Sequence, residues 1–249
     1  MWKILRTELL RACMDLKTYA AAVLIILIYI DKGRIEHWQH IYGVLISNEE
    51  LYFVAPSLLG LVSASSFADD LNSGYYRPMC LRYGVSAYVR AKAIYIMIAP
   101  LCLAMICHVA FFLSMVMRGV ELHEDTLIND SQYLGWALNY GHWWPYMLGG
   151  GLCLGMASCL LISMAAYASV YIHSRLFIWV MPIMMNMVCF ISTSYLRVSN
   201  RFNINRLMRG SVGGLEPCPT LWLLILLVLP TVLIMWAFVR AAKRRVLNA

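Results

Sequence analysis

Long runs of apolar residues without a charged side chain constrain this chain more than any other feature. Spanning the hydrocarbon core of a bilayer takes about 20 consecutive apolar residues in a helix. Four runs reach about that length, at 93–117, 146–172, 176–196 and 221–239, and a fifth lies at 51–68. A sixth, at 18–30, is shorter and is flanked by charges that would have to reach the membrane surface. We therefore expect an all-α integral membrane protein, in which 1–249 form a single transmembrane domain with six transmembrane helices.

The distribution of charge predicts an orientation, because Lys and Arg side chains tend to stay on the cytoplasmic side. Six spans with both termini in the cytoplasm place most of the 20 Lys and Arg residues inside and most of the 13 acidic residues outside. The predicted extracytoplasmic loop 197–220 departs from this rule, since it carries Arg197, Arg201, Arg206 and Arg209. The net charge of +7 thus indicates orientation, and we expect contact with membrane lipids but with no nucleic acid.

Residues 1–16 show the pattern of an amphipathic helix. Trp2, Leu5, Leu9, Cys13 and Leu16 recur at spacings of three and four residues, while the charged residues occupy other faces. Such a helix is expected to lie on the inner membrane surface, with its apolar stripe at the acyl boundary. A cytoplasmic extension of the first span is the alternative.

Residues 69–92 make up the longest predicted cytoplasmic segment. Gly74 is expected to end the second span, and Pro78 suits the first turn of a short helix. Gly84 would end that helix, and Ser86 would cap the third span. The sequence therefore predicts a short helix lying across the cytoplasmic face of the membrane.

Two acidic residues, Asp69 and Asp70, stand at the start of this segment. A helix end and the nearby Arg77 or Arg82 could satisfy their charges.

The chemistry of an enzyme is largely missing from the sequence. No GxxxxGK[ST] stretch occurs, so ATP and Mg²⁺ would be handled by another polypeptide. Membrane enzymes place ionisable residues within their spans, and here His108 is the exception in otherwise uncharged spans. A hydrogen bond to another helix is favoured over a proton carrier at that position. We expect no catalytic site and no cofactor in this chain.

Candidate ligands for a metal are few. Glu36, His37 and His40 could share one helical face, and His123 with Asp125 offers further ligands, but four ligands at a recognised spacing are missing. We expect no metal site.

Small residues gather in the fourth predicted span. Gly149, Gly150, Gly151 and Gly155 include a small-xxx-small spacing, which allows close approach of a second helix. Packing within one subunit is the favoured interpretation, and a pore lining or a dimer seam are the alternatives.

The stretch FADDLNSGYYRPMCLRYGVSAYVRAK contains in order Phe67, Asp70, Gly74, Arg82, Tyr88 and Lys92. In this pattern the chain resembles the permease subunits of type V ABC exporters, six-span bacterial transporters whose ATPase is usually a separate chain. In that family an acid and a glycine close the second span, a short coupling helix follows, and an Arg, Tyr, Lys series leads into the third. The amphipathic start WKILRTELLRACMD is similar to the family's connecting helix.

The resemblance implies a membrane subunit of an ATP-driven exporter in the bacterial cytoplasmic membrane. Its partners would be two copies of an ABC ATPase subunit and a second permease subunit, and its substrate an amphipathic peptide, lipid or drug-like molecule. The residues implied to couple it to the ATPase are Asp69, Asp70, Gly74, Arg77, Arg82 and Tyr88. The family often places short re-entrant helices between the fifth and sixth spans, where the basic loop of this chain departs from the pattern. A non-transporting membrane scaffold, sensor or immunity protein is the alternative.

Overall fold

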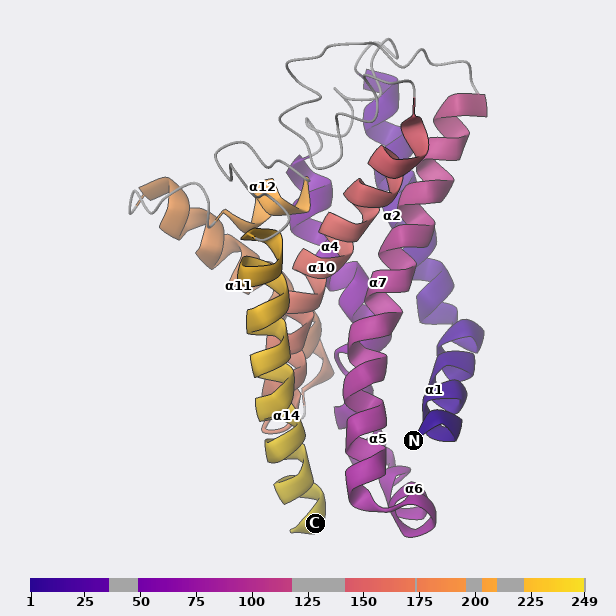
Figure 1. The fold of residues 1–249 in the computed structure, drawn as a ribbon, viewed down its shortest axis with the longest axis vertical. Coiled ribbons are helices and arrows are strands. Elements are labelled where there is room, and N and C mark those ends of the chain that lie inside the picture. The colour runs from indigo at the N-terminus through magenta and orange to yellow at the C-terminus, as the bar shows by residue number, and fades with distance from the viewer. Residues whose placement is uncertain (36–48, 118–141, 173, 196–202, 210–221, 249) are drawn as a thin grey trace.

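The computed structural model describes residues 1–35, 49–117, 142–172, 174–195, 203–209 and 222–248, and the elements in these ranges are all helical (Figure 1). Four helices are long and apolar enough to cross a membrane, at Val85–Ser114, Trp144–Ser169, Arg175–Thr193 and Ile225–Leu247. They lie in α7 (Val85–Met117), α10 (Trp143–Ser169), α11 (Arg175–Tyr195) and the stretch formed by η2 (Leu224–Val228) and α14 (Leu229–Leu247). The chain is thus an all-α protein with four helices of membrane-spanning character.

The first two predicted spans are built differently from the other four. α2 (Leu16–Ile35) has an apolar part, Leu16–Ile28, that is shorter than a full span. The run 51–68 is not one helix, because α4 (Glu49–Ser63) ends and the chain turns into α5 (Ser66–Ser73). The last carbonyls of α4 accept hydrogen bonds from side chains instead of from the helix itself. Ser66 Oγ donates to Ser63 O at 2.7 Å, and Tyr95 OH donates to Val62 O at 2.9 Å.

The short helix predicted in the cytoplasmic segment is present as α6 (Tyr76–Tyr83), with Pro78 in its first turn. Gly74, with a φ of 72°, ends α5, and Gly84, with a φ of 84°, ends α6. Glycine adopts this left-handed backbone without the steric penalty of other residues. α7 begins at Val85, so the uncharged run that starts at 93 is only part of this helix, and Ser86 lies inside α7 instead of capping it as predicted.

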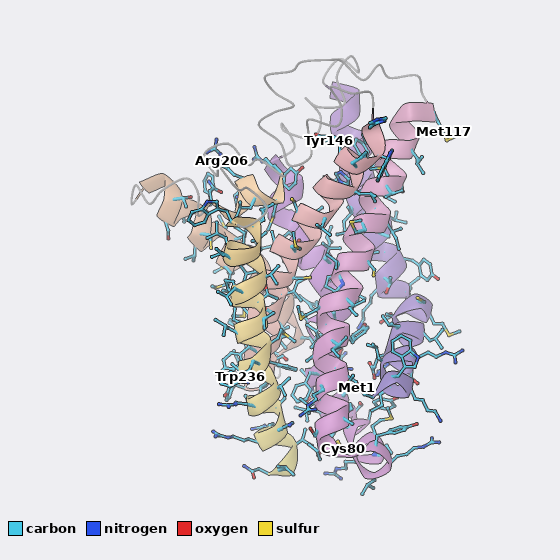
Figure 2. The ribbon with its side chains drawn as sticks, in the orientation of Figure 1. Met1, Cys80, Met117, Tyr146, Arg206 and Trp236 are labelled. Atoms are coloured by element: carbon cyan, nitrogen blue, oxygen red, sulfur yellow. The ribbon has the colours of Figure 1, made fainter. Side chains whose placement is uncertain are left out.

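α10 lies at the centre of the bundle and packs against α7, α4, α11 and α14. The end of the bundle that carries α6 also carries the C-terminus, and α1 (Trp2–Met14) lies beside the lower part of α7 (Figure 1). Figure 2 places Met1 and Cys80 towards this end and Tyr146 and Arg206 towards the other.

The glycines of α10 allow a close approach to α7. A Cβ atom added at Gly155 would come 2.7 Å from Leu101 Cδ1, and one added at Gly150 would come 2.8 Å from His108 Nε2. Both of those side chains belong to α7. The glycine stripe therefore packs α10 against α7 of the same subunit, which was the favoured interpretation.

Only part of the apolar stripe predicted for α1 packs against the rest of the bundle. Its buried residues are Ile4, Leu5, Glu8 and Ala12. Leu5 belongs to the stripe, whereas Trp2 and Leu16 are 73% and 79% exposed. An extended residue, Asp15, separates α1 from α2.

A short helix, α12 (Ile204–Met208), occupies the described part of the loop 197–220. It contacts α10 and α11 and buries Ile204, Asn205, Leu207 and Met208. Asn203 caps it, because its side-chain oxygen accepts from the amides of Asn205 and Arg206.

A buried polar contact ties α11 to α4. Pro56 in α4 has no N–H, so the carbonyl of Tyr52 lacks the donor four residues ahead in its own helix. Asn186 of α11 supplies one, with its Nδ2 donating to Tyr52 O at 3.0 Å. Asn186 is fully buried, and an unpaired carbonyl in this apolar setting would be unfavourable.

We predict that Asn186→Leu lowers the stability of the protein in detergent by about 1 kcal/mol, because the Tyr52 carbonyl then loses its donor. In a Pro56→Ala background the loss should be smaller, since the amide of residue 56 can bond to that carbonyl. Thermal unfolding of the four variants measures the coupling, with Met187→Leu on the exposed side of α11 as control. An equal loss in both backgrounds would refute the pairing.

Candidate functional site

The candidate coupling residues divide into a buried group and an exposed group. Asp70 and Tyr88 are fully buried, in the middle of α5 and near the start of α7. Arg77 and Arg82 lie exposed on α6, and Gly74 forms the turn between α5 and α6. The side chains of Asp70 and Tyr88 are in direct contact, and the Arg77 amide donates to the Gly74 carbonyl at 3.1 Å.

Five side chains from three helices form what we call the buried charge cluster: Glu8, Arg11, Asp70, Tyr88 and Lys92. The Lys92 ammonium lies 2.6 Å from Asp70 Oδ2 and 2.8 Å from Glu8 Oε2. Tyr88 OH donates to Asp70 Oδ2 at 2.7 Å, and an Arg11 guanidinium nitrogen donates to Asp70 Oδ1 at 3.0 Å. Both carboxylate oxygens of Asp70 are therefore held, and Lys92 bridges α1 to α5.

Local helix geometry brings these residues together. Tyr88 and Lys92 are four residues apart on α7, and Glu8 and Arg11 are three apart on α1, so each pair shares one face of its helix. Phe67 and Asp70 are three residues apart on α5 and also share one face. Phe67 packs edge-on against Phe238 of α14, with ring centroids 5.3 Å apart. One turn of α5 thus contacts α1, α7 and α14.

The charges of the cluster balance. Glu8 and Asp70 carry one negative charge each, and Arg11 and Lys92 one positive charge each. The Lys92 side chain is 1% exposed and that of Asp70 is fully buried, so neither is solvated by bulk water. An ion pair in such a place is held by its partners, and removing one partner leaves an uncompensated buried charge.

Two groups at the edge of the cluster have shifted pKa values. Burial acts to lower the pKa of Arg11, but the hydrogen bond and the charge of Asp70 outweigh it, and the pKa lies above its usual value. Burial and the nearby Glu8 carboxylate raise the pKa of Tyr75. Arg11, whose guanidinium also lies over the Tyr75 ring at 4.9 Å, is therefore a permanent cation, and Tyr75 remains neutral at physiological pH.

Asp69 makes a separate set of contacts with other helices. It forms an ion pair with Arg175 at the start of α11, and Ser65 Oγ donates to its other oxygen at 3.1 Å. Lys17 of α2 lies 4.0 Å from the same oxygen. The two neighbouring acids of α5 thus reach α1 and α7 on one side and α2 and α11 on the other.

Asp69 lies in the first turn of α5, as the predicted helix end requires, but the predicted arginine partners of the two acids were wrong. Arg77 and Arg82 were expected near Asp69 and Asp70, but Arg77 lies over the ring of Tyr76 and Arg82 over that of Tyr83. The acids instead pair with cations from other helices, because α5 turns them into the bundle while α6 turns its arginines outward.

Sequence reasoning missed Glu8, Arg11 and Arg175 as partners. One signal for Glu8 was present in the sequence: it lies four residues from both Ile4 and Ala12, on the face that the structure buries. The sequence held no comparable signal for Arg175, whose partner is distant along the chain.

A small cavity of about 60 Å³ adjoins the cluster, lined in part by Glu8, Ser65, Asp69 and Tyr95. A polar cavity of this size has room for water. Among the described residues, no group of three or more His, Cys, Asp or Glu side chains could hold a metal ion. The earlier candidates Glu36, His37, His40, His123 and Asp125 lie outside the described residues. The cluster can therefore fix helices to one another.

We predict that Lys92→Met lowers the free energy of unfolding by about 3 to 5 kcal/mol, because it leaves Glu8 and Asp70 with Arg11 as their only cation in the cluster. Adding Glu8→Met should restore much of the loss, since Asp70 keeps Arg11 and Tyr88. Chemical unfolding in detergent measures both variants.

The adjacent acids provide the control. Asp70→Asn should lower stability more than Asp69→Asn, because the Asp69 side chain keeps 17% of its surface exposed. Equal effects of the two substitutions, or no recovery in the double variant, would contradict the cluster as described.

Comparison of the chain with protein-family models, with curated proteins and with solved structures finds no match. The similarity of the stretch from Phe67 to Lys92 to the type V exporter permeases therefore remains a resemblance in sequence pattern.

Proposed function

We propose that this chain is the membrane-spanning subunit of an ATP-driven exporter of the type V ABC kind. It has six spans and both termini in the cytoplasm of a bacterial cell. Two partner ATPase subunits bind ATP and Mg²⁺ and hydrolyse the nucleotide, while paired permease subunits move an amphipathic peptide, lipid or drug-like substrate.

The observation that carries this proposal is the attachment of α6 to the bundle. α6 follows α5 after a glycine turn and leads directly into α7. α5 is fixed by Asp70 to α1 and α7, by Phe67 to α14 and by Asp69 to α11. An element that transmits force must be firmly held at its base, because a loose loop would dissipate the movement of its partner.

The outward face of α6 suits a protein partner. Arg77, Pro78, Leu81 and Arg82 are exposed, and Leu81 is 89% exposed although it is a large apolar residue. An apolar anchor flanked by two cations would fit a groove with an acidic rim.

The arrangement of the helices supports the proposed topology. α6 and the C-terminus lie at one end of the bundle, where α14 ends with Arg244 and Arg245 (Figure 1). Basic residues of this kind favour the cytoplasmic side. At a rise of about 1.5 Å per residue, α2 is about 30 Å long, enough to reach across the hydrocarbon core if the charged residues at its two ends extend to the membrane surface. α4 continued by α5 would serve as the second span, which gives six with the four long helices.

We predict that Arg82→Glu leaves the protein folded in the membrane but lowers capture of the ATPase subunit at least about ten-fold, because the reversed charge meets an acidic rim. Copurification of the tagged chain from its native membrane measures the capture. Arg90→Glu, a reversal on an exposed residue of α7, is the matched control.

Two outcomes would reject the exporter. Full ATPase capture and transport by Arg82→Glu would make α6 ordinary surface. Purification of the wild-type chain without any ATPase, or with one permease subunit per complex, would favour the membrane scaffold instead.

We further predict that Asn248→Cys on a background without native cysteines is protected from an impermeant thiol reagent in intact cells. Asn129→Cys, in a predicted outside loop, should react. Labelling of residue 248 in intact cells would place the C-terminus outside and invert the topology.

A further inference from the structure

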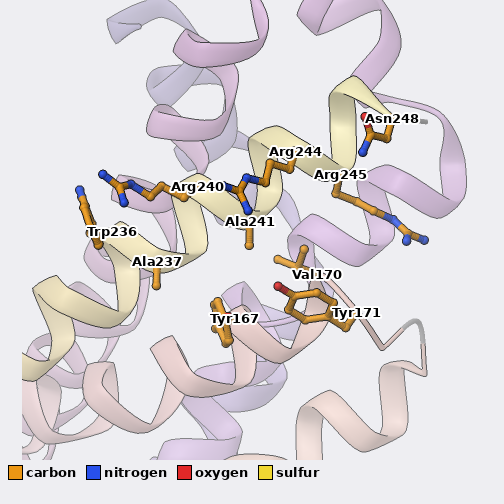
Figure 3. Close-up of a pocket in the computed structure, with 10 residues that line it drawn as sticks. All are labelled: Tyr167, Val170, Tyr171, Trp236, Ala237, Arg240, Ala241, Arg244, Arg245 and Asn248. Atoms are coloured by element: carbon orange, nitrogen blue, oxygen red, sulfur yellow. The ribbon is translucent and has the colours of Figure 1, made fainter.

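An open cleft of about 690 Å³ lies between the last turns of α10 and α14, at the end of the bundle that carries α6 (Figure 3). α14 contributes Arg240, Arg244 and Arg245 to it, and none of the ten described residues that line it is acidic. Its volume falls in the range typical of ligand sites, about 300 to 1,000 Å³. The cleft therefore has the size and the charge for an anionic ligand larger than a single phosphate.

The arginines of α14 form a row along the cleft. Arg240 and Arg244 are four residues apart and so lie on one face of the helix. Figure 3 shows Arg240 with Trp236 at one end of the cleft, and Arg245 with Asn248 at the other. Guanidinium groups bind phosphate oxygens in a bidentate manner, and this row offers several such contacts.

The remaining walls of the cleft are apolar and aromatic. Val170, Ala237 and Ala241 line it, and Tyr167 of α10 and Tyr171, just after the end of α10, face α14 across it (Figure 3). An aqueous anion would gain nothing from these alkyl groups, whereas the glycerol and upper acyl carbons of a lipid would bury against them.

The position of the cleft along α14 also favours a lipid ligand. The apolar part of α14 runs up to Val239, and the basic residues begin at Arg240. Trp236 lies one turn earlier, 55% exposed, with its ring 3.5 Å from the Arg240 guanidinium carbon. Tryptophan and arginine side by side at the end of a span are typical of the level of the lipid headgroups.

We infer that this cleft binds the phosphate-bearing headgroup of an anionic phospholipid, with its acyl chains descending along α10 and α14. Basic pockets between spans at the cytoplasmic end of a membrane protein suit such headgroups. The inference takes the cytoplasmic side of the cleft from the topology proposed above, but it uses no residue of α6 or of the buried charge cluster, so its test is separate from that of the exporter.

The test is retention of lipid by the purified full chain. The protein is reconstituted in vesicles of phosphatidylcholine and phosphatidylglycerol in equal amounts, extracted in mild detergent and examined by native mass spectrometry. The wild-type chain should keep phosphatidylglycerol in preference to phosphatidylcholine. Arg240→Gln with Arg244→Gln should lower the retained phosphatidylglycerol by about five-fold for each arginine, the factor expected for one basic side chain near an anionic surface.

Matched controls separate a site from general surface charge. Lys243 lies next to Arg244 on α14 but does not line the cleft, so Lys243→Gln with Arg90→Gln removes the same charge and should keep the lipid. Equal losses in the two double variants, or retention of phosphatidylcholine in equal amount, would overturn the site. Displacement of the lipid by added inorganic phosphate would overturn the lipid assignment and leave a site for the free anion.

Discussion

The contact of Lys92 with Asp70 and Glu8 is the interaction on which the rest of this structure depends. A lysine and two carboxylates in an apolar bundle are unfavourable singly, and they persist because Lys92 pairs with both carboxylates and Arg11 balances the remaining negative charge. Lys92 lies in the part of α7 that precedes its uncharged run, and its pairing with Asp70 and Glu8 lets this part of the helix pack inside the bundle.

This buried contact turns a polar segment into a rigid one. α5 has only eight residues and would be unstable as an isolated helix. It is held because its two acids and Phe67 reach helices on several sides, so its order comes from tertiary contacts and not from its own sequence. α6 is held in place because the short turn at Gly74 joins it to α5. Its own outer face contacts little of the protein.

The sequence predicted the parts whose cause is local. Uncharged runs identified the four long helices, and Gly74, Pro78 and Gly84 identified α6, because turns and spans follow from composition within a few residues. The charged partners of Asp70 could not be predicted in that way, since Arg11 and Lys92 come from helices far apart in the chain. The pattern containing Asp70, Tyr88 and Lys92 did select residues that meet in space, but it assigned Asp70 to an arginine of α6 that points outward.

Unequal burial of the long helices suggests how a movement of α6 would spread. In the apolar window of α10, 72% of the residues are buried, against 22% for α11. α10 and α7 meet through glycines with little space between them, so these two helices would move as a unit. α11 is attached by fewer contacts, among them the Asn186 bond to Tyr52 and the Arg175 pair with Asp69 at its start. A displacement of α5 would therefore carry the α7 and α10 pair through the buried charge cluster, and would pull on α11 through a single exposed ion pair. The bundle is accordingly stiff along α7 and α10 and compliant at α11, where a change of shape would require the least loss of packing.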